Sequence, residues 1–117
     1  METYFETAKG KIYLGNCLEY LKNVSDKSVN LIVTSPPYAL IKKKKYGNEN
    51  SDAYLDWFRP FAEEFYRVLA DNGSFVLNIG GSWNKGEPTR SLYHFKILIM
   101  LLVTASLTAT IPVRLSL

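Results

Sequence analysis

A chain of 117 residues is long enough to bury a core as one domain without disulfides or bound metals. Its composition, 47% hydrophobic and 21% charged, excludes a disordered or fibrous chain, and its single cysteine excludes a disulfide framework and a Cys/His metal cluster. The net charge of +3 suits a polyanionic partner such as nucleic acid. The acidic amino terminus lacks the features of a signal peptide, so we expect a cytoplasmic protein.

The first third of the chain alternates strand-like and helix-like segments. Lys11–Leu14 predicts a short strand and Cys17–Val24 has apolar residues at helical spacing, so we expect a βα step at the start of the chain. The nearly continuous apolar, β-branched run at Val29–Val33 is typical of a parallel strand buried on both faces. This strand leads directly into the sequence Thr34-Ser35-Pro36-Pro37-Tyr38.

A basic, polar segment at residues 39–50 separates this strand from the next helix. It contains Lys42, Lys43, Lys44 and Lys45, and its composition supplies no core face, so we expect an exposed loop. Two interpretations of the four lysines stay open. They contact DNA phosphates, or they simply lie in a solvated loop.

The centre of the chain predicts its longest helix. Apolar residues recur at three- and four-residue steps from Ser51 to Leu69, with Ser51 or Asp52 available as the N-cap. Pro60 lies inside this helix and is expected to kink it. Asp71-Asn72-Gly73 is expected to end the helix as a glycine C-cap.

A second buried strand is predicted at Ser74–Ile79, before a loop that begins at Gly80-Gly81. Alternating strands and helices with short connections predict an α/β domain with a mostly parallel sheet. Ligands of such folds bind beyond the carboxyl ends of the strands, so the residues just after Val33 and Ile79 are expected at that edge.

Residues 97–113 carry no charge and approach the ~20 residues that span a bilayer. Their threonines, serines and Pro112 favour a core helix that begins near Ser91. A membrane anchor is the less favoured alternative.

The motif Ser35-Pro36-Pro37-Tyr38 carries the most chemical information. The exocyclic amino group of a base is a poor nucleophile because its lone pair is delocalised into the ring, so methylating it requires acceptors that grip its hydrogens. The Ser35 side chain and a proline carbonyl supply such acceptors, and Tyr38 offers a face for a base turned out of the duplex. A rigid turn or a polyproline partner-binding element is the alternative, but the strand before and the helix after favour catalysis.

This motif resembles the catalytic motif of the DNA amino-methyltransferases, which modify cytosine at N4 or adenine at N6. The Ser-Pro-Pro-Tyr form is associated with cytosine-N4 enzymes, whereas adenine-N6 enzymes usually carry Asp at the position of Ser35. The resemblance extends over residues 10–98 and includes Tyr54–Phe58, 67–74 and Asn78-Ile79-Gly80.

The resemblance implies a cofactor, S-adenosylmethionine, and a place for it. Gly15-Asn16-Cys17-Leu18 is similar to the family's Gly-Asp-Cys-type segment on the adenosine side of the cofactor, which makes Asn16 and Cys17 candidate cofactor-binding residues. Asn16 replaces the more usual Asp. The expected fold is therefore a partial Rossmann-like S-adenosylmethionine-dependent methyltransferase fold, with no metal.

The resemblance also has a limit. A Phe-x-Gly-x-Gly-type cofactor loop, which family members with this motif order carry late, has no match, and residues 99–117 form an apolar tail unlike the family. We expect residues 1–98 to be the amino-terminal part of a DNA N4/N6 methylase domain, followed by a tail that arose by frameshift or truncation.

The expected function is site-specific methylation of cytosine N4 in duplex DNA with a flipped target base, within a restriction-modification system that includes a cognate endonuclease. Adenine-N6 methylation is one alternative. An inactive remnant that at most binds DNA is another.

Overall fold

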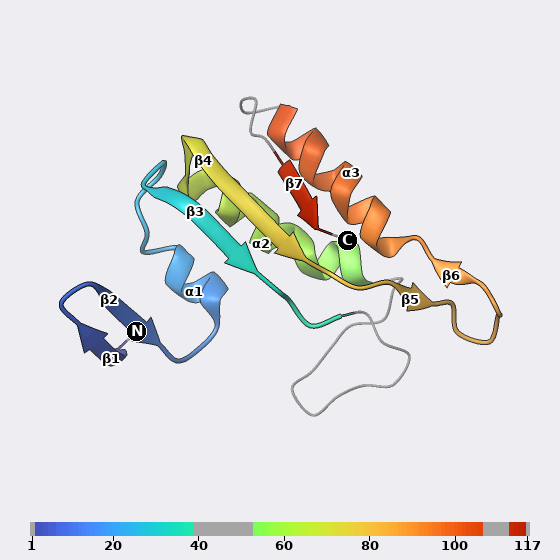
Figure 1. The fold of residues 1–117 in the computed structure, drawn as a ribbon, viewed down its shortest axis with the longest axis horizontal. Helices are drawn as coiled ribbons and strands as arrows, with labels where there is room; N and C mark the ends of the chain where they lie inside the picture. The colour runs from blue at the N-terminus through green and yellow to red at the C-terminus, as the bar shows by residue number, and fades with distance from the viewer. Residues whose placement is uncertain (1, 39–52, 107–112, 117) are drawn as a thin grey trace.

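A three-stranded parallel sheet organises the molecule, for which the computed structural model describes residues 2–38, 53–106 and 113–116 (Figure 1). The sheet consists of β3 (Val29–Thr34), β4 (Leu69–Asn78) and β7 (Val113–Ser116), in the order β3-β4-β7. The predicted α/β class with a mostly parallel sheet is confirmed.

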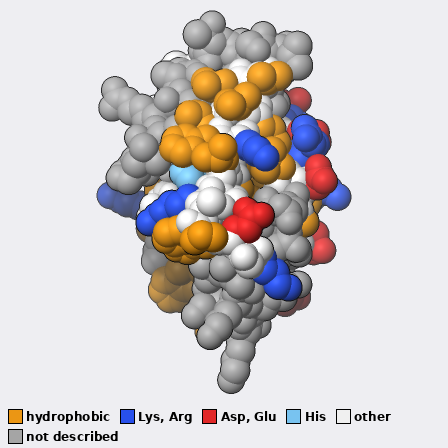
Figure 2. Space-filling model, turned by 90° about the vertical axis from the view of Figure 1, so that its right-hand side faces the viewer, with side chains coloured by type: hydrophobic (Ala, Val, Ile, Leu, Met, Phe, Trp, Pro, Cys, Tyr) orange, Lys and Arg blue, Asp and Glu red, His pale blue; other side chains and the backbone are white. Residues whose placement is uncertain are grey.

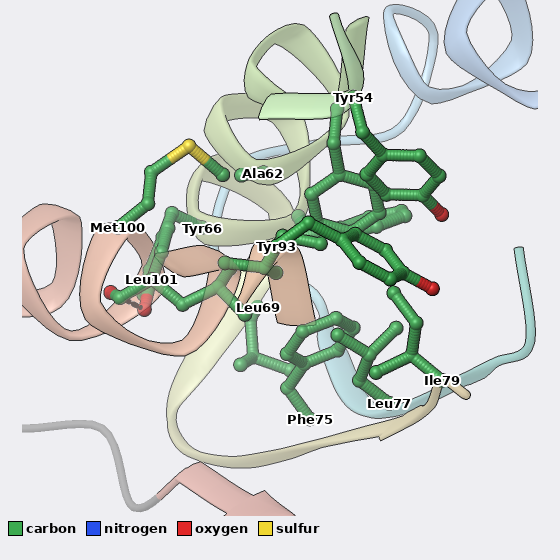
Figure 3. Packing of buried hydrophobic residues seen from close by; sticks show 13 residues of the cluster. Tyr54, Ala62, Tyr66, Leu69, Phe75, Leu77, Ile79, Tyr93, Met100 and Leu101 are labelled. Carbon is green, nitrogen blue, oxygen red and sulfur yellow. Dashed lines mark hydrogen bonds between the residues drawn. The ribbon is translucent and has the colours of Figure 1, made fainter. Parts of the chain in front are cut away.

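Two helices connect these strands, and both lie on one face of the sheet. The helix α2 (Tyr54–Val68) follows β3 and the helix α3 (Tyr93–Ser106) follows β4. Right-handed crossovers between strands that are added in chain order place their helices on the same face. The two helices pack against each other over the alternate side chains of β4, which point toward them (Figure 3).

The core is formed by the apolar stripe of α2, the inward side chains of β4 and one side of α3. Tyr54, Phe58 and Phe65 recur at helical spacing and are buried, as the sequence pattern predicts, and Ala62 is buried beside them. The other members of the buried cluster are Tyr66, Leu69, Phe75, Leu77, Ile79, Tyr93, Ile97, Met100 and Leu101.

The opposite face of the sheet is uncovered along β3. The prediction that this strand is buried on both faces is wrong, because Leu31 and Val33 are 57% and 67% exposed. The cause is the one-sided placement of α2 and α3. Within the described ranges, no element packs over these two side chains.

The amino-terminal segment differs from the predicted βα step. The strand β2 (Gly10–Tyr13) pairs with β1 (Thr3–Thr7) as an antiparallel hairpin and does not join the parallel sheet. The helix α1 (Cys17–Leu21) ends three residues earlier than predicted. Its end tightens because the amides of Asn23 and Val24 donate to carbonyls three residues back.

The transition from α2 to β4 also differs from the prediction. Leu69 is already extended, with φ −71° and ψ 128°, so the strand begins where the helix ends and no glycine C-cap forms. Gly73 instead lies where a Cβ atom would come within 2.8 Å of Leu69 Cδ1 and 2.9 Å of the Ala70 carbonyl. Close packing, and not left-handed backbone, is what requires glycine here.

The start of α2 differs from the predicted N-cap. The N-cap of α2 is Ala53, which makes no side-chain capping bond, and the predicted caps Ser51 and Asp52 lie outside the described residues. The helix is continuous through Pro60.

After β4 the chain forms a short hairpin of β5 (Ser82–Trp83) and β6 (Arg90–Ser91) and then enters α3. The predicted core helix near Ser91 is confirmed, since Tyr93 and Ile97 of α3 are buried. None of the described helices is long and apolar enough to cross a membrane. The helix also runs across residue 98, so the predicted boundary between 98 and 99 does not coincide with a break in structure and stays a prediction.

Candidate active site

The Ser35–Tyr38 turn lies at the carboxyl edge of the parallel sheet. It follows β3 directly, and the register pairs Thr34 with Leu77 of β4, so the residues after both strands meet at one edge. Gly80, just beyond β4, confirms this meeting, because a Cβ atom built on it would lie 3.0 Å from Cε2 of Tyr38. The residues that follow the two strands therefore meet at one edge of the sheet, as predicted.

Ser35, Pro36, Pro37 and Tyr38 together line a surface pocket of about 260 Å³. Ser35 is exposed, whereas the other three residues are half-buried. Two prolines in succession fix two φ angles and remove two N–H donors, which leaves carbonyl oxygens as the polar backbone groups between Ser35 and Tyr38. The structure thus brings all four predicted catalytic residues into one small, acceptor-rich concavity.

Tyr54 holds this turn from beneath. Its hydroxyl donates a hydrogen bond of 2.7 Å to the Pro37 carbonyl, and its side chain is fully buried in the first turn of α2. Burial raises the pKa of the Tyr54 phenol far above its ordinary value, and the nearby Tyr93 and Tyr38 raise it further. The hydroxyl therefore stays protonated and remains a donor.

A second tyrosine holds the neighbouring backbone in the same way. The Tyr93 hydroxyl donates to the Gly80 carbonyl, and the rings of Tyr93 and Tyr54 meet edge to face with centroids 4.9 Å apart. The two hydroxyls point toward the same side of the cluster, near Ile79 (Figure 3). Sequence reasoning treated Tyr54 as a core position only. The usable signal was its position in the first turn of a helix that follows the motif, where a polar-tipped aromatic can reach back.

The candidate cofactor residues Asn16 and Cys17 lie on a different element, at the start of α1. The Asn16 side-chain oxygen accepts a 3.0 Å hydrogen bond from the Leu18 amide, which makes Asn16 the N-cap of the helix. Cys17 is exposed, and partial burial of its sulfur raises the pKa of the thiol. A role for either residue in cofactor binding stays a prediction.

The predicted DNA-binding residues Lys42, Lys43, Lys44 and Lys45 lie outside the described residues. In the described part of the chain, no three His, Cys, Asp or Glu residues group as metal ligands would.

Basic and aromatic side chains nevertheless flank the site on the β5–β6 hairpin. The Arg90 guanidinium lies 4.8 Å from the centroid of the half-exposed Trp83 ring, within cation–π range. A Cβ atom on Gly81 would approach the same guanidinium to 3.3 Å, so this pair borders the glycines beside the turn. Figure 2 shows the face at this end of the molecule, where basic side chains lie among hydrophobic ones.

Comparison with known protein families assigns the chain to one of them. Residues 29–108 match the model of a DNA methylase family, which is more than half of the chain and includes β3 and the turn. The chain therefore belongs to the DNA methylase family, as the Ser-Pro-Pro-Tyr motif indicates.

Two individual relatives that the chain resembles are type II methyltransferases. The chain is 44% identical over 98 residues to the type II methyltransferase M.PvuII of Proteus hauseri, covering 84% of this chain and 29% of that protein. It is 42% identical over 88 residues to the type II methyltransferase M.BamHI of Bacillus amyloliquefaciens, covering 72% and 21% respectively.

Among solved structures, a cytosine-N4-specific PvuII DNA methyltransferase matches with a TM-score of 0.70 and 43% identity, over 83% of this chain and 34% of that one. The predicted methyltransferase fold, in partial form, is confirmed. The chain spans about a third or less of the length of each of these relatives.

Proposed function

We propose that this chain supplies the base-holding part of a site-specific DNA methyltransferase that modifies the N4 amino group of cytosine in duplex DNA. The observation that carries the proposal is the Ser35–Tyr38 pocket at the carboxyl edge of β3, with its Pro37 carbonyl held by Tyr54. The likeness to a cytosine-N4-specific methyltransferase supports the choice of cytosine.

The turn divides its acceptors between structure and substrate. The Pro37 carbonyl accepts a bond from Tyr54, and we assign the Ser35 hydroxyl and the Pro36 carbonyl as the acceptors for the two amino hydrogens of a flipped base. When these two acceptors bind both amino hydrogens, the lone pair becomes localised on the amino nitrogen of the base. A methyl donor, when bound, would supply its methyl group to that nitrogen, and the nitrogen would give up one of its protons to solvent.

Tyr38 supplies the stacking surface for the flipped base. Its ring is half-buried and rests against the backbone of Gly80, where a side chain larger than hydrogen would press on the ring. A base turned out of the duplex loses stacking with its neighbours, and an aromatic face in the pocket replaces part of it.

The methyl donor proposed for this site is S-adenosylmethionine, which supplies an electrophilic methyl group when bound. The described residues fit it in part. With its side-chain oxygen used as the α1 cap, Asn16 keeps its amide nitrogen as a donor, which suits the oxygen and nitrogen acceptors of an adenosine. Asn16 and Cys17 would lie on that side of the donor.

Two alternatives are tested with the same reagents. Adenine-N6 methylation uses the same grip on an exocyclic amine, so Ser35 does not exclude it. An inactive remnant that at most binds DNA is the other alternative. Membership of a restriction-modification system with a cognate endonuclease is proposed because the matched relatives are type II methyltransferases.

The test is to incubate the 117-residue chain with methyl-labelled S-adenosylmethionine and unmethylated duplex DNA, and to digest the DNA to nucleosides. Labelled N4-methylcytosine, lost in Ser35→Ala, is the expected result. Labelled N6-methyladenine would favour the adenine alternative. DNA binding without any labelled nucleoside would favour the inactive remnant.

A further inference from the structure

Two buried hydroxyl groups converge on the backbone that frames the pocket. The Tyr54 hydroxyl donates to the carbonyl of Pro37, the residue before Tyr38. The Tyr93 hydroxyl donates to the carbonyl of Gly80, which packs against the Tyr38 ring. Tyr54 and Tyr93 also contact each other edge to face. Tyr54 of α2 and Tyr93 of α3 therefore form one unit that holds the turn following β3.

The bond to Pro37 fixes a rotation that the prolines leave open. The pyrrolidine ring locks φ of Pro37, so the Pro36 carbonyl can turn relative to the Pro37 carbonyl mainly about ψ of Pro37. Holding the Pro37 carbonyl on Tyr54 removes that freedom. The direction of the Pro36 carbonyl is thereby set by a residue outside the motif.

The bond to Gly80 fixes the floor under the stacking ring. Cε2 and Cδ2 of Tyr38 lie 3.0 and 3.1 Å from where a Gly80 Cβ would be, so the ring packs directly against this backbone. The Tyr93 hydroxyl bond connects Gly80 to the first turn of α3, and the Tyr93 side chain is only 1% exposed. Packing of α3 is in this way transmitted to the plane of Tyr38.

We propose that Tyr54 and Tyr93 are positioning residues for methyl transfer, which set the direction of the Pro36 carbonyl and the plane of the Tyr38 ring. This inference rests on the proposed function of the turn. The two tyrosines touch neither the base nor the donor in this scheme. Their effect is on alignment, where a displacement of about 1 Å can cost on the order of 100-fold in rate.

The same core contains a matched control. The Tyr66 hydroxyl donates to the Leu101 carbonyl, so Tyr66→Phe deletes one buried hydroxyl and its bond to a backbone carbonyl, as Tyr54→Phe and Tyr93→Phe do. Figure 3 shows this bond at the opposite end of the cluster from the hydroxyls of Tyr54 and Tyr93. All three substitutions should lower the stability of the fold by a similar amount.

The first experiment measures geometry on the full 117-residue chain and needs no activity. Backbone amide resonances of Ser35 and Tyr38, which flank the two prolines, are compared among wild type and the three Phe variants. We expect Tyr54→Phe and Tyr93→Phe to shift both resonances and Tyr66→Phe to leave them in place. Equal shifts in all three variants, or none in the first two, would overturn the proposal. If one of the first two variants fails to fold, the other decides.

The second experiment measures methyl transfer with the same proteins. We expect kcat to fall about 5- to 100-fold in Tyr54→Phe and Tyr93→Phe, with KM for DNA and for S-adenosylmethionine within about twofold. Tyr66→Phe should retain kcat within about twofold. A wild-type chain without transfer would count against the proposed function, while the resonance shifts would still decide the positioning role. An active wild type whose three variants behave alike would overturn the positioning role alone.

Discussion

The two ends of β3 are held by different kinds of interaction. At the start of the strand, which we call the anchor end, Arg67 donates to the Leu21 and Val24 carbonyls at 2.6 and 2.8 Å. It also pairs with Asp26 at 2.5 Å and Glu64 at 2.7 Å. One guanidinium therefore joins α1, the loop before β3 and α2 through charge-assisted bonds.

At the finish of the strand, which we call the turn end, neutral tyrosine hydroxyls hold the Ser35–Tyr38 turn. Tyr54 and Tyr93 each use one hydrogen bond from below, so Ser35 stays exposed on the outer side. Charged, multivalent bonding fixes one end of the strand, while the other end keeps its acceptors open. The comparison shows how a fold can separate the source of its stability from the place where a ligand binds.

The largest effect is expected at the anchor end. Arg67→Met keeps an unbranched stem but leaves two carbonyls and two carboxylates without their shared donor, so the free energy of unfolding should fall by about 3 kcal/mol. Urea denaturation measures it, with the exposed Arg59→Met on the same helix as the control. An equal loss of unfolding free energy in both variants would show that the Arg67 bonds do not stabilise the fold.

Gly73→Ala should have the next largest effect. Its new methyl group would meet the Ala70 carbonyl at 2.9 Å, and backbone cannot yield as a flexible side chain can, so we expect a loss of about 2 kcal/mol in denaturation. Gly10→Ala is the matched control, since its nearest neighbour is Thr7 Oγ1 at 3.8 Å. A fully stable Gly73→Ala variant would mean that the start of β4 is loosely packed.

Gly80→Ala should change the turn end while changing the stability of the fold only slightly. The added methyl group presses on the Tyr38 ring, which can tilt toward the pocket, so the loss in stability should stay below about 1 kcal/mol. The amide resonance of Tyr38 should nevertheless shift. In the neighbouring Gly81→Ala, the methyl group meets the movable end of Arg90, and the Tyr38 resonance should keep its position.

The smallest effect concerns the pH dependence of stability at Cys17. Burial raises the pKa of this thiol, so the unfolded chain loses its proton at lower pH than the folded chain does. The stabilisation is complete below the ordinary thiol pKa and is lost as pH rises through the raised one. The difference in unfolding free energy between wild type and Cys17→Ser should therefore decrease from neutral to alkaline pH. A constant difference would contradict it.

The sequence was most informative where periodicity and burial coincide. The spacing of Tyr54, Phe58 and Phe65 predicts α2, and the apolar runs predict β3 and β4, because burial of those faces drives these elements to form. The motif and the edge on which it lies followed from the order of strand and helix.

The parts that could not be predicted depend on contacts between distant residues. The strand predicted at Lys11–Leu14 corresponds to β2, but its partner β1 is exposed along its length and carries no clear alternation, while β5 and β6 are two residues each. The role of Gly73 arises from one close approach of chain to chain. The Tyr54 hydroxyl bond spans 17 residues, so helical spacing identifies Tyr54 as a core aromatic and does not by itself predict the bond to Pro37.

We propose that the target cytosine enters the Ser35–Tyr38 pocket and stacks on Tyr38. Photo-crosslinking of the chain to duplex DNA in which 5-iodocytosine replaces cytosine, followed by mass spectrometry of the joined peptide, tests this proposal. We expect a crosslink at Tyr38 that is lost in Tyr38→Ala. A crosslink confined to another exposed aromatic such as Trp83, and unchanged in Tyr38→Ala, would contradict it.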